Sequence, residues 1–123
     1  MLLDLANLAG YIGSAMSCAP FCIESIMITR IFRVSVPKSL HHEFEKNFLS
    51  VSVPYVKAQP GFISVVVGKP TSWEPEEYVM ISVWDSEADV AAFAGKNWNR
   101  AVIPQGMEKY VSKCWVHHYE NFD

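Results

Sequence analysis

Two adjacent histidines near the end of the chain, His117 and His118, carry the side chains best suited to moving a proton, because imidazole titrates near neutral pH. They lie in an apolar and aromatic run, Ser112 to Tyr119, that predicts a strand. Neighbouring strand residues point to opposite faces of a sheet, so only one of the two can face a pocket. We take His117 as the candidate proton relay, and the faces of the sheet decide between it and His118.

Two arginines occupy the first expected strand, which alternates from Ile28 to Val36. A guanidinium group can stabilise an anionic oxygen such as a phenolate, and Arg30 is our candidate for that role beside Arg33. The alternative for both is an ion pair at a strand edge. Aromatic side chains that can form the walls of an apolar pocket are Tyr78, Trp84, Phe93 and Trp98. Each of these can equally be a core or interface residue.

The stretch from Tyr78 to Phe93 predicts how these groups are positioned. Its first half alternates with a period of two and has β-branched and aromatic residues on both sides, which indicates a strand with two packed faces. Alanines at helical spacing follow, and Asp85 or Ser86 can accept the free N–H groups of a helix's first turn. We expect a strand, a tight turn and a capped helix.

The other elements follow in a clear order from Met27. A helix is expected to begin near Ser39, with Pro54 kinking or ending it, and a turn at 59–61 leads into a β-branched run. That run, Phe62 to Val67, predicts a strand buried on both faces. A polar loop precedes the strand at Tyr78, and a further short helix is expected near residues 105–110 before the last strand.

Composition sets the limits on size and partners. A chain of 123 residues, half of them apolar, is one domain, and its 13% aromatic content leaves surface for a pocket or a second subunit. A net charge of −3 without a Lys/Arg cluster argues against a nucleic-acid surface. Three cysteines without metal spacing favour reduced thiols in a cytoplasmic protein, with no metal site.

The first 26 residues form an extension ahead of the domain at 27–123. The apolar stripe of this extension is interrupted by Gly10, Gly13 and Pro20, which argues against a membrane span. It lacks the basic start of a signal peptide. A short packing helix and a leader upstream of the functional unit both remain open.

The order β-α-β-β-α-β is that of the α+β ferredoxin-like fold, a four-stranded antiparallel sheet with both helices on one face. The expected strands carry apolar residues on both sides, so the other face also needs a cover. A second copy packed sheet to sheet provides one, and we expect a homodimer through the open sheet face, a dimeric α/β barrel.

Several of these features together resemble one family. Pro60-Gly61-Phe62 at the second strand, Trp84-Asp85-Ser86 before an alanine-rich helix, Trp98 and the aromatic last strand are similar to the antibiotic biosynthesis monooxygenase (ABM) superfamily over about Met27 to Phe122. The resemblance implies a dimer with a pocket in each subunit between the sheet and its helices. Members include cofactor-independent oxygenases of polycyclic phenols and haem-degrading enzymes.

The chain departs from some members of that family. Haem-degrading relatives place an Asn on the first strand and a ligand His beyond the second helix, whereas this chain has Arg30-Ile31-Phe32-Arg33 and no His between Trp98 and Tyr110. Other members carry a His in the second helix, where Phe93 stands here. Haem degradation is therefore a minor alternative.

Oxidising a phenol with O₂ and no cofactor needs a water-poor cavity, a proton acceptor and donors that orient the oxygens. The resemblance thus implies a small cofactor-independent monooxygenase of an aromatic or quinol-type metabolite, with the candidate residues above. The competing hypothesis is a non-catalytic dimeric binding or stress-related module. An apolar cavity large enough for two or three rings, with a buried polar group projecting into it, would favour the enzyme.

Overall fold

The computed structural model describes residues 26–122, which contain one four-stranded antiparallel sheet. Its strands are β1 (Ile28–Ser35), β2 (Phe62–Gly68), β3 (Glu77–Trp84) and β4 (Lys113–Glu120), in the spatial order β2-β3-β1-β4. Arg30 on central β1 pairs with Ser82 of β3 and with His118 of β4. Directly paired residues share a face, so these three side chains project to the same side of the sheet.

The first helical region runs from η1 (Lys38–Leu40) through α1 (His41–Asn47) and the π-helical η2 (Phe48–Ser52) to α2 (Val53–Lys57). Pro54 does not end the helical region, because it lies in the first turn of α2 after the π-helical segment. The N–H of Val53 bonds to the carbonyl of Phe48 across five residues. The wider π-turn therefore makes room for a proline that lacks its own donor.

The second helix, α3 (Glu87–Ala94), begins as the sequence predicts. Ser86 is its N-cap, and its Oγ accepts a hydrogen bond of 3.2 Å from the backbone N–H of Asp89. Gly61, at the start of β2, has a positive φ of 83°, and its carbonyl accepts from the N–H of Asp85. A Cβ at this position would collide with the Asp89 side chain, so a glycine is needed where β2 meets the start of α3.

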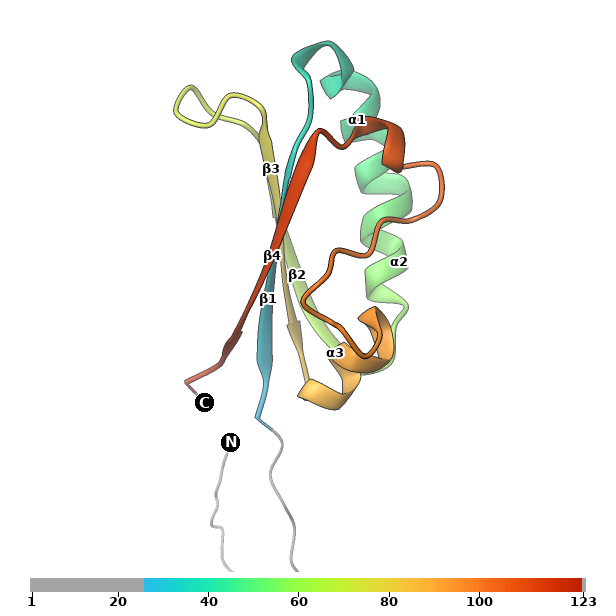
Figure 1. The fold of residues 1–123 in the computed structure, drawn as a ribbon, viewed down its shortest axis with the longest axis vertical. Coiled ribbons are helices and arrows are strands. Elements are labelled where there is room, and N and C mark those ends of the chain that lie inside the picture. Colours follow the sequence, from blue (N-terminus) through green and yellow to red (C-terminus); the bar gives the residue numbers. More distant parts are fainter. Residues whose placement is uncertain (1–25, 123) are drawn as a thin grey trace, which may run out of the picture.

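Within residues 26–122, all of the helices lie on one side of the sheet, as the ferredoxin-like order predicts, and no element of this range covers the opposite side (Figure 1). The core lies between the two layers. Its fully buried side chains include Val34, Tyr78, Trp84, Val90 and Tyr110. Along β3, buried inner residues alternate with partly exposed outer ones, which is the period of two that the sequence shows.

The side of the sheet away from the helices, called here the outer face, has apolar side chains on all four strands, among polar ones such as Arg33 and His117. It carries the side chains of Ile31, Val66, Val79, Ile81, Val83, Trp115 and Tyr119. The expectation that β2 is buried on both faces is wrong for the single chain, in which Val66 is 65% exposed. β2 is an edge strand, and nothing within residues 26–122 covers its outer face.

The extension expected over residues 1–26 lies outside the described residues except for Ile26, and so do Cys18 and Cys22. Cys114 on β4 is a free, partly buried thiol. Within the described range, the helices are too short or too polar to cross a membrane.

Candidate functional site

A cavity lies between the inner face of the sheet and the helices, and its volume is about 40 Å³. It is called the inner cavity below. The sheet, the helices and the segment after α3 all contribute to its mostly apolar wall. Principal lining residues are Arg30, Phe32, Met80 and Ser82 from the sheet, Phe44, Phe48, Ser52 and Phe93 from the helices, and Val102, Ile103, Pro104 and Met107 from the segment.

Arg30 is the charged group of this wall, and it is only 3% exposed. Its Nη1 donates to the carbonyl oxygen of Trp98 at 2.8 Å, and its Nη2 donates to the carbonyl oxygen of Arg100 at 2.8 Å. Burial lowers its pKa to about 10, so the group is still a cation at neutral pH. A buried cation held by neutral carbonyls has charge left to attract an anion.

His118 lies beside Arg30, with its Nε2 at 2.8 Å from the Nη1 of Arg30. A guanidinium can only donate, so Nε2 must be the acceptor and the ring proton sits on Nδ1. Burial, and then the charge of Arg30, lowers the pKa of His118 to about 4. The imidazole is therefore neutral at pH 7, and its edge meets the ring of Trp98 at a centroid distance of 4.5 Å.

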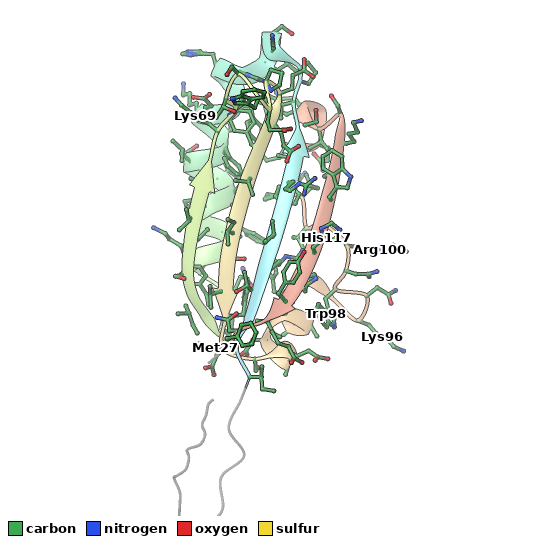
Figure 2. The ribbon with its side chains drawn as sticks, turned by 90° about the vertical axis from the view of Figure 1, so that its left-hand side faces the viewer. Met27, Lys69, Lys96, Trp98, Arg100 and His117 are labelled. Atoms are coloured by element: carbon green, nitrogen blue, oxygen red, sulfur yellow. The ribbon has the colours of Figure 1, made fainter. Side chains whose placement is uncertain are left out.

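His117 lies on the other side of β4. It pairs with Ile31, is exposed, and belongs to the face of the sheet that Figure 2 shows toward the viewer. The structure thus places His118, and not His117, next to Arg30. Alternation along β4 predicts that the two point apart, but the helices decide which face is the inner one.

The four expected wall residues have different positions. Phe93 lines the inner cavity, with the guanidinium carbon of Arg30 5.3 Å from its ring centre. Trp84 is wholly buried behind it, stacked on Phe93 at 4.8 Å, and its Nε1 donates to Ser82 Oγ. Trp98 contributes its carbonyl to Arg30 and its ring to His118.

Tyr78 is a core residue on the inner face of the sheet, where it pairs with Val34. Its hydroxyl donates to Glu45 Oε2 at 2.7 Å, and burial raises its pKa. It lines a separate groove of about 200 Å³ with Leu49, Val67 and Lys69. Of the expected site residues, the structure brings together Arg30, Phe93 and Trp98, whereas Trp84 and Tyr78 pack in the core.

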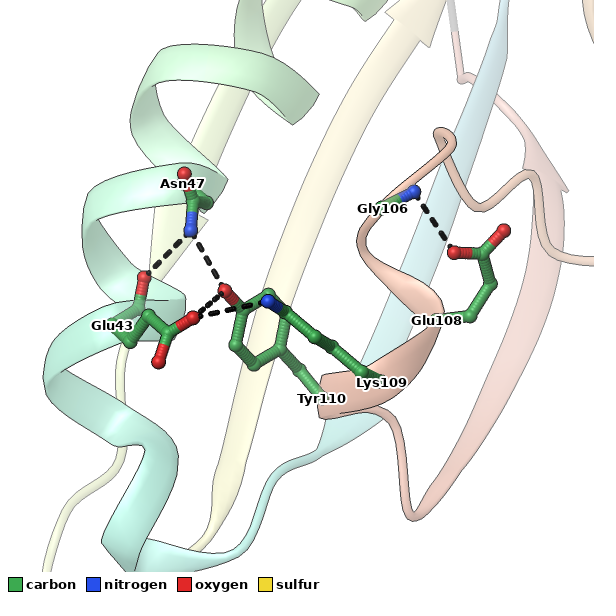
Figure 3. Close-up of polar contacts among 6 residues, drawn as sticks. All are labelled: Glu43, Asn47, Gly106, Glu108, Lys109 and Tyr110. Atoms are coloured by element: carbon green, nitrogen blue, oxygen red, sulfur yellow. Dashed lines mark hydrogen bonds and ion pairs between the residues drawn. The ribbon is translucent and has the colours of Figure 1, made fainter.

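The segment that closes the inner cavity is anchored at its C-terminal end by a polar network (Figure 3). Tyr110, in η3 (Glu108–Tyr110), donates its hydroxyl proton to Glu43 Oε2 at 2.6 Å and accepts from Asn47 Nδ2 at 2.8 Å. Lys109 Nζ is 3.2 Å from Glu43 Oε2. The hydrogen bond from Tyr110 and then Lys109 lower the pKa of Glu43, so the carboxylate form holds η3 against α1.

Some lining residues were not expected from the sequence. Ser82 interrupts the large inner residues of β3 and places a hydroxyl in the cavity wall, and this lone small polar residue in the alternation was a usable signal. Ser52 has a similar position on the helix side. Val102, Ile103 and Pro104 lie in a segment without regular structure, so no periodicity marks them.

The fit of haem and of metal ions can be judged from the donors present. The inner cavity has no His or Cys in its lining that could bind a haem iron. His118 is already engaged by Arg30 and Trp98. No group of three or more His, Cys, Asp or Glu side chains that could hold a metal ion occurs between residues 26 and 122. This arrangement does not fit haem.

Comparisons with known proteins agree on the fold. The family model for antibiotic biosynthesis monooxygenase matches residues 27–100. Among solved structures, the cofactor-independent oxygenase SnoaB of Streptomyces nogalater has a TM-score of 0.60 at 19% identity, over 80% of this chain and 96% of its own.

Two further solved structures have a similar fold. The haem-degrading protein Rv3592 of Mycobacterium tuberculosis has a TM-score of 0.58 at 22% identity, over 81% of this chain and 96% of its own. A Shewanella oneidensis protein has a TM-score of 0.61 at 15% identity, over 81% of this chain and 95% of its own. A search of curated proteins finds no match. At such identities the likeness to solved structures shows a shared fold and no shared chemistry.

Proposed function

The chain belongs to the antibiotic biosynthesis monooxygenase family, and from that premise we propose that it is a small monooxygenase that oxidises an aromatic or quinol-type metabolite without a cofactor. The observation that carries the proposal is Arg30, a buried cation in the wall of an apolar cavity beside a neutral imidazole. The likeness to a cofactor-independent oxygenase supports it at the level of fold.

Arg30 is the proposed anchor for the substrate oxygen. Three of the five guanidinium N–H donors are used by Trp98, His118 and Arg100, which leaves two for a ligand. A cation in an apolar wall stabilises a phenolate far better than it would in water. A phenolate is the electron-rich form that can pass an electron to O₂.

His118 is the proposed proton acceptor, in place of His117. Its Nε2 lone pair points at Arg30 in the free protein, so the base is blocked until Arg30 turns to the substrate oxygen. The charge of Arg30 also contributes to the low pKa of His118. A phenolate that neutralises Arg30 removes this contribution and makes His118 a better base.

The proposed reaction needs no outside reductant. A ring C–H para or ortho to the hydroxyl becomes a carbonyl, so a phenol and O₂ give a quinone and water. One oxygen atom enters the product and the other leaves as water, and the substrate supplies all of the electrons. The hydroxyl proton passes to His118 and returns to the reduced oxygen.

We also propose that the protein acts in the cytoplasm as a homodimer through the outer face. Apolar side chains on all four strands support this assembly, because an uncovered patch of this kind on a monomer is unfavourable in water. The partly buried free thiol of Cys114 is compatible with a reducing compartment.

One observation favours the competing candidate, a non-catalytic dimeric binding module. The inner cavity of about 40 Å³ is nearly filled by its own side chains and has no space for two rings without movement. A module of this kind would bind ligands and leave O₂ unconsumed.

Oxygen uptake with a panel of naphthols and hydroquinones distinguishes the two candidates. Uptake by the wild type without haem or flavin, reduced roughly a hundredfold in both Arg30→Gln and His118→Gln, is the result that the enzyme predicts. Arg33→Gln and His117→Gln are matched controls, because they change the same residue types on the outer face. Ligand binding by thermal shift with no uptake under any condition would contradict the enzyme and favour the module.

A further inference from the structure

The segment 96–105, called here the lid, covers the inner cavity between two glycines with positive φ. Gly95 has φ 93° and Gly106 has φ 92°, and a Cβ at either position would meet no atom within 4 Å. Between them the chain has no helix or strand. Both ends of the lid are thus free of steric restraint, and glycine can change its backbone angles at little cost.

Few bonds hold the lid itself. The backbone bond from Arg100 N to Asn97 O is local to it, and Met107 N bonds to Pro104 O at its end. The hydrogen bonds that link it to the sheet come from Arg30, which donates to the carbonyls of Trp98 and Arg100, and the Trp98 ring also packs against His118 of β4. These two bonds fasten the middle of the lid across β1, while the Tyr110 network fastens the chain beyond Gly106.

The side chains of the lid occupy the space where a ligand would sit. Val102, Ile103 and Pro104 line the inner cavity, whose volume is about 40 Å³. An aromatic ligand cannot enter while the lid is in this position. Entry therefore requires that the lid moves, and the bonds to Arg30 must break for it to do so.

We propose that Arg30 is a latch that selects the ligand: an anionic oxygen competes with the carbonyls of Trp98 and Arg100 for the guanidinium group and releases the lid. Bonds between a guanidinium and an anion are stronger than bonds to neutral carbonyls, so the exchange is favourable. A ligand of the same shape without an ionisable hydroxyl offers no such gain. The latch thus confines the site to aromatic molecules with an acidic hydroxyl.

This inference rests on the proposed function for the place and class of the ligand, but not on turnover. The probe is 2-hydroxy-1,4-naphthoquinone, whose hydroxyl is ionised at pH 7, and its neutral match is 2-methoxy-1,4-naphthoquinone. Both are already oxidised, so binding is observed without reaction. Hydrogen exchange of peptides over 96–105 is measured by mass spectrometry, with the full chain.

The hydroxy compound is expected to raise exchange of the lid in the wild type by roughly tenfold, which is the effect of losing one or two hydrogen bonds that hold it. The methoxy compound is expected to leave exchange unchanged. In Arg30→Gln the lid exchanges fast without any ligand, and in Arg33→Gln it behaves as in the wild type.

A second variant guards against loss of folding in Arg30→Gln. Arg30→Lys keeps the charge, but an ammonium group lacks the fork that reaches two carbonyls, so the lid should still exchange faster. Tyr110→Phe is expected to loosen residues 108–110 and leave the response to the two naphthoquinones intact.

Equal effects of the two naphthoquinones, or slow lid exchange in both Arg30 variants, would overturn the latch. Its failure is distinct from that of the monooxygenase. Oxygen uptake can be absent while the latch responds to the hydroxy compound, and uptake can be present with a lid that ignores Arg30.

Discussion

Arg30 and His118 are paired across β1 and β4, and the Nη1 of Arg30 donates to the Nε2 of His118 at 2.8 Å. The bond needs an unprotonated Nε2, so the folded protein holds His118 neutral. Two groups that can both carry positive charge in acid, the buried Arg30 and the half-buried His118, are thus in direct contact. Their proximity links the stability of the fold to pH. It also means that Arg30, the proposed substrate anchor, controls the basicity of His118, the proposed base.

His118 should make the protein less stable as the pH falls. Its pKa is about 4 when folded against 6.5 as the ordinary value, so the unfolded chain binds the proton more readily between these pH values. Stability from this group is complete above pH 6.5 and is lost as the pH falls toward 4. Urea unfolding at pH 7.5, 5.5 and 4.5 should show that His118→Gln loses less stability than the wild type.

The control for this pH dependence is His42→Gln, on the exposed side of α1. It should follow the wild-type curve at each pH. Parallel curves for His118→Gln and the wild type would mean that His118 titrates alike in the folded and unfolded states.

Trp84 should be among the most costly residues to truncate. It is wholly buried, stacks on Phe93 and bonds to Ser82. Trp84→Ala should lower the free energy of unfolding by about 3–5 kcal/mol, from lost burial and the cavity left behind. Trp73→Ala, at an 88% exposed position, should stay within about 0.5 kcal/mol in the same urea titration. Similar losses in both would show that Trp84 is not a core residue.

Gly61→Ala should destabilise the protein for two reasons. The positive φ costs a non-glycine residue about 1–2 kcal/mol, and the new methyl group would also displace Asp89 from the first turn of α3. Gly106→Ala has a similar φ but open space, so it isolates the backbone part. Thermal unfolding should place Gly61→Ala below Gly106→Ala, and the reverse order would refute the contact with Asp89.

Val66→Glu should dissociate the proposed homodimer. Val66 pairs with Ile81 at the outer face, and a carboxylate there would be buried without a partner if two outer faces meet. Sedimentation velocity at micromolar concentration should show a dimer for the wild type and a monomer for Val66→Glu. Leu49→Glu, on the exposed helical side, should remain a dimer. A monomeric wild type, or a dimeric Val66→Glu, would rule out this interface.

Local patterns in the sequence predicted most of the fold, because they reflect forces that act between near neighbours. The alternation in β3, the cap at Ser86 and the turn before Phe62 all lie where the sequence places them. The sequence predicts that Pro54 kinks or ends the helix, whereas the helical region continues past it, and the π-turn that accommodates it has no signature in residue type. The sequence does not predict that the outer face of β2 is exposed in the single chain, because edge and central strands differ in their neighbours and not in their own residues.

The sequence by itself determined the order of the elements, the candidates Arg30, Phe93 and Trp98, and the rule that only one of two adjacent histidines can face inward. Only the tertiary structure decided that this histidine is His118, because the choice depends on which face of the sheet the helices cover. It also placed the carbonyls of residues 98 and 100 on Arg30. Contacts of this kind join backbone atoms about 70 residues apart to one side chain, and no local pattern encodes them.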